Sequence, residues 1–128
     1  MSQENVEIVR GALESDAPLS DYERFAPDAE FDFTDLPDQR LLRGVEELRA
    51  FRDSGPWGRS ATLTPERYFD VDDERVLAFV RIKAVGQRSG TPVDLAFAHE
   101  FTLRRGVIVR MKIHLDRDRA LADLGLED

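Results

Sequence analysis

The hydrophobic period of this sequence changes near residue 61, and this change restricts the possible fold more than any other feature. Before it, most apolar residues recur every three or four positions, whereas after it apolar and polar residues alternate. Four alternating segments follow, over residues 61–71, 75–86, 91–104 and 107–116. They are separated by the short turn sequences Asp72-Asp73, Ser89-Gly90 and Arg105-Gly106. Because consecutive strands joined by short turns pair antiparallel, this half predicts an antiparallel sheet.

The first half of the chain predicts helices with one brief strand between them. The expected elements are helices over residues 2–15, 19–27 and 44–55 and a strand over residues 29–37. In the first helix, Val6, Val9 and Leu13 fall on one face at helical spacing. Pro27 ends the second helix and Gly55 closes the third. Residues 117–126 are amphipathic and form either a short final helix or a frayed tail.

The turn at Arg105-Gly106 sets the register of the last two strands. We expect a three-residue loop, residues 104–106, with Gly106 in the left-handed conformation. This loop pairs Leu103 with Val107, and counting back then sets His99 opposite Met111. A two-residue loop would mix apolar and polar side chains on both faces, so we reject it. The resulting apolar face is broken only by His99 and contains Leu95, Phe97, Phe101, Leu103, Val107, Val109, Met111, Ile113 and Leu115.

The other face of this hairpin carries mixed side chains. Glu100 is expected opposite Arg110, as a cross-strand charge pair. His114 and Asp116 alternate onto the same face, and only a bulge in the last strand would turn Asp116 inward. The two histidines lie on separate faces and the carboxylates lack ligand spacing, so we expect no metal site.

Composition limits the class of protein. A chain of 128 residues, 41% of them hydrophobic, is long enough for one domain, residues 1–128, and too short for two. The net charge of −8 argues against binding to nucleic acid or to an anionic membrane, since both need a basic surface. The absence of cysteine excludes disulfides, thiol nucleophiles and thiolate metal sites. Since the N-terminal residues lack the apolar core of a signal peptide and no segment approaches about 20 apolar residues, we expect a cytoplasmic protein.

Three stretches carry a resemblance to a known family: SQENVEIVR, then DAEFDF followed by LLRGVEELRAF, and finally FAHEFTLRRGVIVRMKIHLDRDRAL. Together with the order of expected elements, they resemble the nuclear transport factor two-like fold, also called cystatin-like α+β. Within this fold the chain is similar to the SnoaL-like polyketide cyclases over nearly its whole length. The resemblance implies a cone-shaped domain, in which helices pack on a strongly curved, mainly antiparallel sheet and enclose a pocket. It also implies homodimers formed through the outer face of the sheet.

The resemblance further places the family's catalytic groups on positions of this chain, where most of them are missing. The carboxylate base of ketosteroid isomerase corresponds to Phe33, and its first-helix tyrosine falls near Ala12 or Leu13. The catalytic aspartate of the polyketide cyclases and of limonene epoxide hydrolase corresponds to Ile113. The hydrolase's Arg-x-Asp pair is missing from ERVLAFVRIK as well. Only His99 occupies the place of a polar pocket group, the oxyanion-binding aspartate of the isomerase.

Three roles for His99 remain open. A histidine in a cavity is suited to take or give a proton, and burial favours its neutral form. The alternatives are a hydrogen bond to a ligand, or a packed imidazole bonded to a backbone carbonyl or a buried hydroxyl. Further candidates are Asp35 and Asp38 after the first strand, Trp57 as an aromatic lid or a core anchor, and Asp116 as a catalytic carboxylate.

The sequence therefore predicts a mostly apolar pocket for a small, largely apolar molecule, and leaves two classes of function. One is a cofactor-independent isomerase, cyclase or lyase acting on a carbonyl compound, in which His99 polarises the carbonyl or moves a proton. The other is a non-catalytic ligand-binding or dimerisation module that kept the pocket and lost the carboxylates. We expect no cofactor. The predicted pocket residues around His99 are Phe31, Phe33, Trp57, Phe97, Phe101, Met111 and Ile113.

Overall fold

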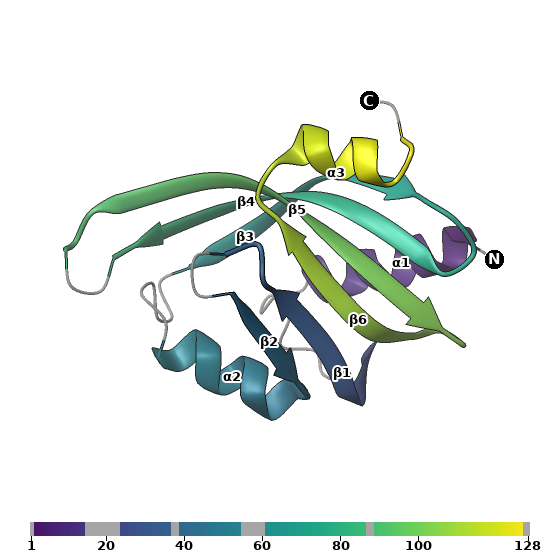
Figure 1. Ribbon diagram of the computed structural model, residues 1–128, viewed down its shortest axis with the longest axis horizontal. Coiled ribbons are helices and arrows are strands. Elements are labelled where there is room, and N and C mark those ends of the chain that lie inside the picture. Colours follow the sequence, from purple (N-terminus) through teal and green to yellow (C-terminus); the bar gives the residue numbers. More distant parts are fainter. Residues whose placement is uncertain (1, 15–23, 37–38, 55–60, 87–88, 127–128) are drawn as a thin grey trace.

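The computed structural model describes residues 2–14, 24–36, 39–54, 61–86 and 89–126 (Figure 1). Within these ranges the chain forms three helices and six strands. In chain order they are α1 (Ser2–Leu13), β1 (Phe25–Phe33), β2 (Arg40–Arg43), α2 (Val45–Ser54), β3 (Thr62–Asp70), β4 (Arg75–Val85), β5 (Pro92–Arg104), β6 (Val107–His114) and α3 (Arg117–Asp123). The predicted α+β class is confirmed.

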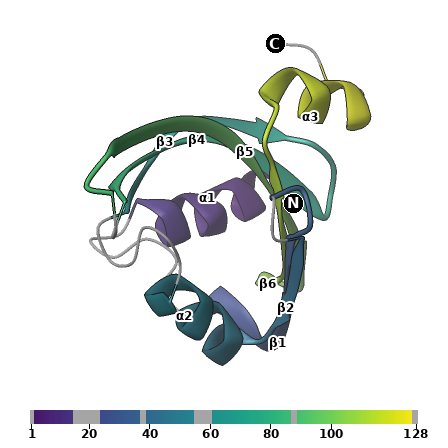
Figure 2. The same cartoon turned by 60° about the vertical axis from the view of Figure 1, so that its left-hand side comes forward.

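The strands form one sheet in the order β2-β1-β6-β5-β4-β3. Neighbouring strands run antiparallel except β1 and β6, which are parallel. The sheet is strongly curved, so that β3, β4 and β5 arch over α1 while β1 and β2 lie beside α2 (Figure 2). The helix α3 lies on the opposite, convex side (Figures 1 and 2). The predicted cone-shaped fold, with helices packed on a strongly curved, mainly antiparallel sheet, is thereby confirmed.

The two faces of the sheet belong to separate hydrophobic clusters. The concave cluster joins α1 and α2 to alternate residues of the strands, among them Phe31, Val80 and Phe101. Because β4 is covered on both faces, residues 76–80 are buried without a break. The convex cluster is smaller and consists of Phe69, Leu77, Phe79 and Ala98 of the sheet with Ala120 and Leu121 of α3.

Local contacts define the helices. The N-terminal α1 buries its predicted apolar side, and Val9, Ala12 and Leu13 have almost no exposed surface. The C-terminal residues form a short helix, α3, which begins after Asp116 and is followed by Gly125 at a φ of 70°. Over the ranges that the structure describes, no helix is both long enough and apolar enough to cross a membrane.

The turn between β5 and β6 differs from our prediction. Its loop has only two residues, Arg105 and Gly106, and Arg104 pairs with Val107 in the register that we rejected. Both loop residues have positive φ angles, 54° and 76°, as the twist of a two-residue hairpin requires. The expected three-residue loop is therefore wrong, because an arginine takes the left-handed conformation that we gave to glycine alone.

A bulge at Val109 corrects the faces that the shorter loop would otherwise mix. Val109 has no partner residue on β5, and beyond it His99 faces Ile113 rather than the predicted Met111. The two-residue loop and the bulge each shift the pairing of β5 with β6 by one residue relative to the predicted register. Because the two shifts add up to two residues, His99 stays on the concave side, as predicted. Near the turn, Ile108 is fully buried. Four residues that we predicted for the apolar face are only partly buried or exposed: Leu95, Val107, Val109 and Leu115.

Two features of the first half also differ from the prediction. Residues 25–27, expected to end a helix, belong to β1, because Phe25 pairs with Ile108 of β6 and enters the concave core. Residues 19–23 of that expected helix, and Gly55, lie outside the described ranges. The strand β2 was not predicted; it pairs with β1 and places Leu42, 3% exposed, beside Phe31.

Candidate functional site

His99 lies on the concave face of the sheet, between Ala78 of β4 and Ile113 of β6. Its side chain is 1% exposed, and its ring centroid lies 6.3 Å from that of Phe101. Alternation along β5 places Phe97 and Phe101 on the same face, on either side of it. The imidazole is thus surrounded by hydrocarbon on both sides along its own strand.

Neither ring nitrogen of His99 has a hydrogen-bond partner among the residues that the structure describes. Burial, together with the electrostatic effect of His114, lowers the pKa of His99 from 6.5 to about 3. The ring is therefore neutral near pH 7 and carries one N–H donor and one acceptor nitrogen. Leaving a buried polar group unpaired costs about 1–3 kcal/mol. A purely structural histidine bonds to a carbonyl or hydroxyl, and no described residue makes such a bond to His99.

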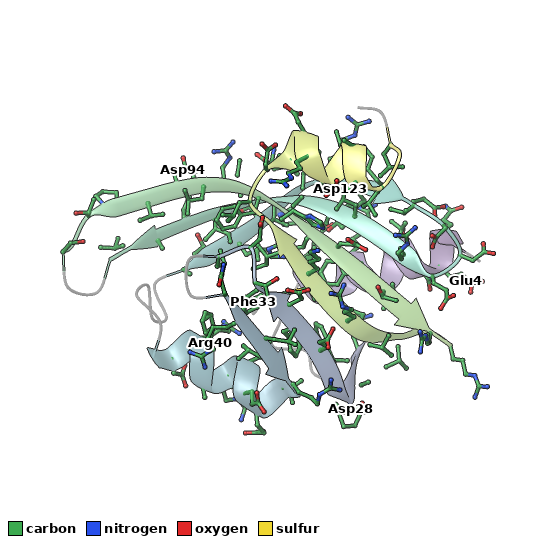
Figure 3. All side chains as sticks on the ribbon, viewed as in Figure 1. Glu4, Asp28, Phe33, Arg40, Asp94 and Asp123 are labelled. Carbon is green, nitrogen blue, oxygen red and sulfur yellow. The ribbon has the colours of Figure 1, made fainter. Side chains whose placement is uncertain are left out.

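The wall around His99 is apolar. Six of the predicted pocket residues are at most 7% exposed and belong to the concave core: Phe31, Phe33, Phe97, Phe101, Met111 and Ile113. Aromatic contacts extend this wall to α2, since the ring centroids of Phe33 and Phe51 lie 5.3 Å apart. Phe33 is labelled in Figure 3, near the centre of the molecule. Partly buried Leu36, Leu63 and Leu95 pack against the same core.

Tyr68 is a polar aromatic residue on the concave side that we did not single out from the sequence. It pairs with Ala78, so Tyr68 and His99 lie in one cross-strand row with Ala78 between them. Its hydroxyl donates to Oε2 of Glu14 at 2.7 Å, and the guanidinium of Arg10 lies 4.6 Å from its ring centroid. Burial and the hydrogen bond to Glu14 raise the pKa of Tyr68. The hydroxyl is thus engaged by Glu14, the residue that follows α1, and does not serve as a proton partner of His99.

The other predicted site residues lie at the surface or outside the described ranges. The carboxylate of Asp116 caps α3 by accepting the backbone N–H of Arg119 at 3.1 Å, and its side chain is exposed. Asp35 Oδ2 accepts the backbone N–H of Leu115 at 2.8 Å. Trp57 and Asp38 fall outside the part of the chain that the structure describes.

Ion pairs gather on the convex face of β1, β5 and β6. His114 Nε2 lies 2.9 Å from Oε1 of buried Glu100, and this hydrogen bond lowers the pKa of Glu100. Arg110 donates to Glu30 and Asp32 of β1. Although burial alone would raise the pKa of Asp32, hydrogen bonds from Thr34 and the charge of Arg110 hold it below the ordinary value. The predicted pairing of Glu100 with Arg110 was wrong, because the shorter loop and the bulge together set Glu100 opposite Lys112.

Two open grooves lie away from His99, at the end of the sheet near the N-terminus of α1. The larger has a volume of about 600 Å³ and is lined by Glu4, Asn5, Ile8, Asp73, Glu74, Leu103, Arg104, Arg105 and Gly106. The smaller, of about 310 Å³, shares Asp73, Glu74 and Arg104 with it. In this region Asn5 donates to the carbonyl of Asp73 at 2.8 Å and Arg104 pairs with Glu74 at 3.4 Å. These side chains are occupied with one another and tie α1 to the strand turns.

No protein-family model matches this sequence, and no curated protein does. Solved structures share its fold. A protein from Jannaschia sp. CCS1, assigned as a SnoaL-like polyketide cyclase, has a TM-score of 0.71 at 19% identity, over 98% of this chain and 94% of that one. TerC, co-crystallised with polyporic acid, has a TM-score of 0.73 at 21% identity, over 94% of this chain and 97% of that one.

A third similar structure comes from Catenulispora acidiphila DSM 44928 and was determined in complex with trimethylamine. It is described as having a ketosteroid isomerase-like fold, with a TM-score of 0.67 at 17% identity, over 99% of this chain and 96% of that one. In all three cases the match extends over almost the full length of both chains. The chain therefore has the NTF2-like fold of the SnoaL-like and ketosteroid isomerase-like proteins.

Proposed function

We propose that the concave interior around His99 binds a small, neutral, largely apolar molecule whose carbonyl or hydroxyl group hydrogen-bonds to this histidine. The observation that carries the proposal is the pair of unpartnered ring nitrogens on a side chain that is 1% exposed. A ligand that supplies an acceptor or donor removes part of the penalty for burying the imidazole. Met111, an unbranched and adaptable neighbour, gives way to the ligand more easily than a branched side chain would.

The surroundings of His99 favour a neutral ligand over an anion. Among the residues that the structure describes, no lysine or arginine is buried. A carboxylate or phosphate there would lose its hydration without gaining a cationic partner, which is costly. A carbonyl compound loses less, and each Å² of apolar surface that it buries contributes about 25 cal/mol.

Binding is better supported than proton transfer. General acid–base catalysis needs a proton acceptor or donor of suitable pKa and a second group to orient it, and no second titratable group of the described chain is within hydrogen-bond reach of His99. Phe33 and Ile113 stand where related enzymes carry carboxylates, and both are buried apolar side chains. Among the structures with this fold, TerC was crystallised with polyporic acid and the C. acidiphila protein with trimethylamine, so small organic molecules do bind proteins of this architecture.

A pair of nearly isosteric probes tests the role of His99. Acetophenone has a carbonyl oxygen where α-methylstyrene has a methylene group. The ratio of their affinities therefore measures the contribution of one hydrogen bond. With a net hydrogen bond of about 1 kcal/mol, the native protein should prefer acetophenone roughly fivefold, and His99→Phe should abolish the preference while still binding α-methylstyrene. His114→Gln, on the convex face, is the matched control and should keep the preference.

The same variants separate a binder from an enzyme. A binding role predicts that small cyclic ketones and polyketide-like esters are bound and not converted. One combined result would contradict the proposal: the native protein turns these compounds over, and His99→Phe lowers the turnover roughly 100-fold or more without changing ligand affinity.

We further propose that two copies associate through the convex face of β1 and β6. Glu30, Asp32, Arg110 and Lys112 bring charges of both signs to this face, as a two-fold, self-complementary contact requires. Sedimentation equilibrium at micromolar concentration should give twice the mass of one chain. A species of one chain's mass alone would contradict this assembly.

A further inference from the structure

Arg117, the first residue of α3, reaches across the convex face and binds the backbone of two strands. Its Nε donates to the carbonyl of Phe97 at 3.1 Å, and its Nη2 donates to the carbonyl of Val80 at 2.9 Å. The same Nη2 pairs with Oε1 of Glu66 at 2.6 Å, and the guanidinium lies 4.7 Å from the ring centroid of Phe79. The side chain is 22% exposed, so these contacts are partly shielded from water.

The two carbonyls belong to Val80 and Phe97, whose side chains form part of the apolar wall beside His99. Val80 and Phe97 lie directly opposite each other on β4 and β5. Their side chains point to the concave side, where they are 0% and 6% exposed and join the core around His99. Phe97 precedes His99 by two residues and therefore lies beside it on the same face. Arg117 thus binds the backbone of Val80 and Phe97 from the convex side, while the side chains of both residues lie on the concave side.

This pair of residues has weak backbone support on both flanks. On the β3 side Val80 faces Pro65, which has no N–H to donate, and a bulge follows immediately between Pro65 and Arg67. On the β6 side the last paired residue of β5 is Ala98, opposite His114, so the pairing stops one residue short of Phe97. The guanidinium fork of Arg117 therefore binds where the pairing with β6 has ended and where β3 offers a proline followed by a bulge.

The position of Arg117 within α3 agrees with a role outside the helix. A cation in the first turn of a helix opposes the helix dipole, so the helix itself gains nothing from this charge. Lysine would keep the charge and the pair with Glu66, but it lacks the planar fork that reaches two carbonyls at once.

We propose that Arg117 is a positioning residue for the concave site: by fixing the Val80–Phe97 pair from the convex side, it holds the wall beside His99. This inference rests on the proposed function for its effect on ligands, but its effect on the sheet does not. Arg117→Lys is the test variant. Glu66→Gln removes only the ion pair, and Arg104→Lys is a matched control at an exposed arginine that pairs with Glu74.

The first measurement needs no ligand. Amide hydrogen exchange should accelerate about tenfold at Val80, Phe97 and their neighbours in Arg117→Lys, while other slow amides of β5 and β6 keep their rates. The ring resonances of His99 should shift in the same variant. Glu66→Gln should change these rates less than about threefold, and Arg104→Lys should leave them unaltered. An equal rise over all slow amides would overturn the proposal, and so would an effect of Glu66→Gln as large as that of Arg117→Lys.

The second measurement uses the two probes. Arg117→Lys should weaken acetophenone and α-methylstyrene by a similar factor, roughly three- to tenfold, because the wall moves while the hydrogen bond of His99 is kept. Unchanged affinity for both probes in a variant with altered exchange would overturn the link to the site. If the native protein binds neither probe, the proposed function fails for them, and exchange and ring resonances still decide whether Arg117 positions the wall.

Discussion

Acid should destabilise this protein because of His99, and the loss should begin at a pH well above the range in which aspartate and glutamate side chains ordinarily titrate. Burial lowers the pKa of His99 from 6.5 to about 3 in the folded chain. In the unfolded chain the imidazole is hydrated and regains an ordinary pKa of about 6.5. Below that pH the unfolded state binds a proton that the folded state does not bind. The stability is therefore complete above pH 6.5 and is lost as the pH falls from there toward 3.

The size of the loss follows from the two pKa values. At pH 5, protonation of the unfolded chain at this one position lowers the free energy of unfolding by about 2 kcal/mol, and the whole window amounts to roughly 5 kcal/mol. Total stabilities are about 5–15 kcal/mol, so the loss at pH 5 is a large fraction. The hydrogen bond from His114 keeps the pKa of Glu100 below its ordinary value of 4.5, so this buried carboxylate is charged at pH 5.

Urea unfolding at pH 7.5, 6 and 5 measures the effect. Between the first and last pH, the native protein should lose about 2 kcal/mol more than His99→Phe, whatever the absolute stability of that variant. In a His114→Gln background, His99→Phe should still change the pH dependence, because burial, the larger cause of the lowered pKa of His99, remains. Parallel pH dependence in the native protein and His99→Phe would refute the reasoning, since it would mean that His99 is protonated, or paired, in the folded state.

Two further predictions concern the surface. Arg105 has a φ of 54°, so Arg105→Gly should raise the free energy of unfolding by a few tenths to about 1 kcal/mol; a loss in urea unfolding would mean that its side chain makes a stabilising contact. Asp116→Ala should lower the free energy of unfolding by about 1 kcal/mol through loss of the α3 cap and leave probe affinity unchanged. A loss of binding or turnover in that variant would restore the functional role that the sequence allowed for this carboxylate.

Alternation of apolar and polar residues, together with the turn sequences, was sufficient to predict the strands of the second half. A strand with one buried and one exposed face has a period of two. The strand β4 is apolar without a break over residues 76–80, and the turn sequences on either side delimit it instead. β3, β4, β5 and β6 all fall within the four predicted segments. The concave position of His99 follows from the same rule. It survived an error in the register because loop and bulge shift the pairing by one residue each.

What the sequence did not predict depends on contacts between distant segments. Residues 25–27 are extended because β6 pairs beside them, and β2 exists because β1 offers an edge with Leu42 turned into the core. The contacts of Arg117 require α3 to fold over the convex face, which no local pattern indicates. That no described residue bonds to His99 is likewise a property of the assembled core, since it depends on every element packed around the ring.

The distribution of charge between the two faces limits the chemistry that this fold can perform. In the described ranges, Glu100, His114 and Arg110 make their pairs on the convex side, whereas His99 lies among hydrocarbon on the concave side. A proton transfer to His99 would create an imidazolium in surroundings that lower its pKa to about 3, so the ion would be disfavoured there. A hydrogen bond donated by the neutral ring carries no such penalty. Within the described part of the chain, the role that fits His99 is therefore that of a neutral hydrogen-bond donor.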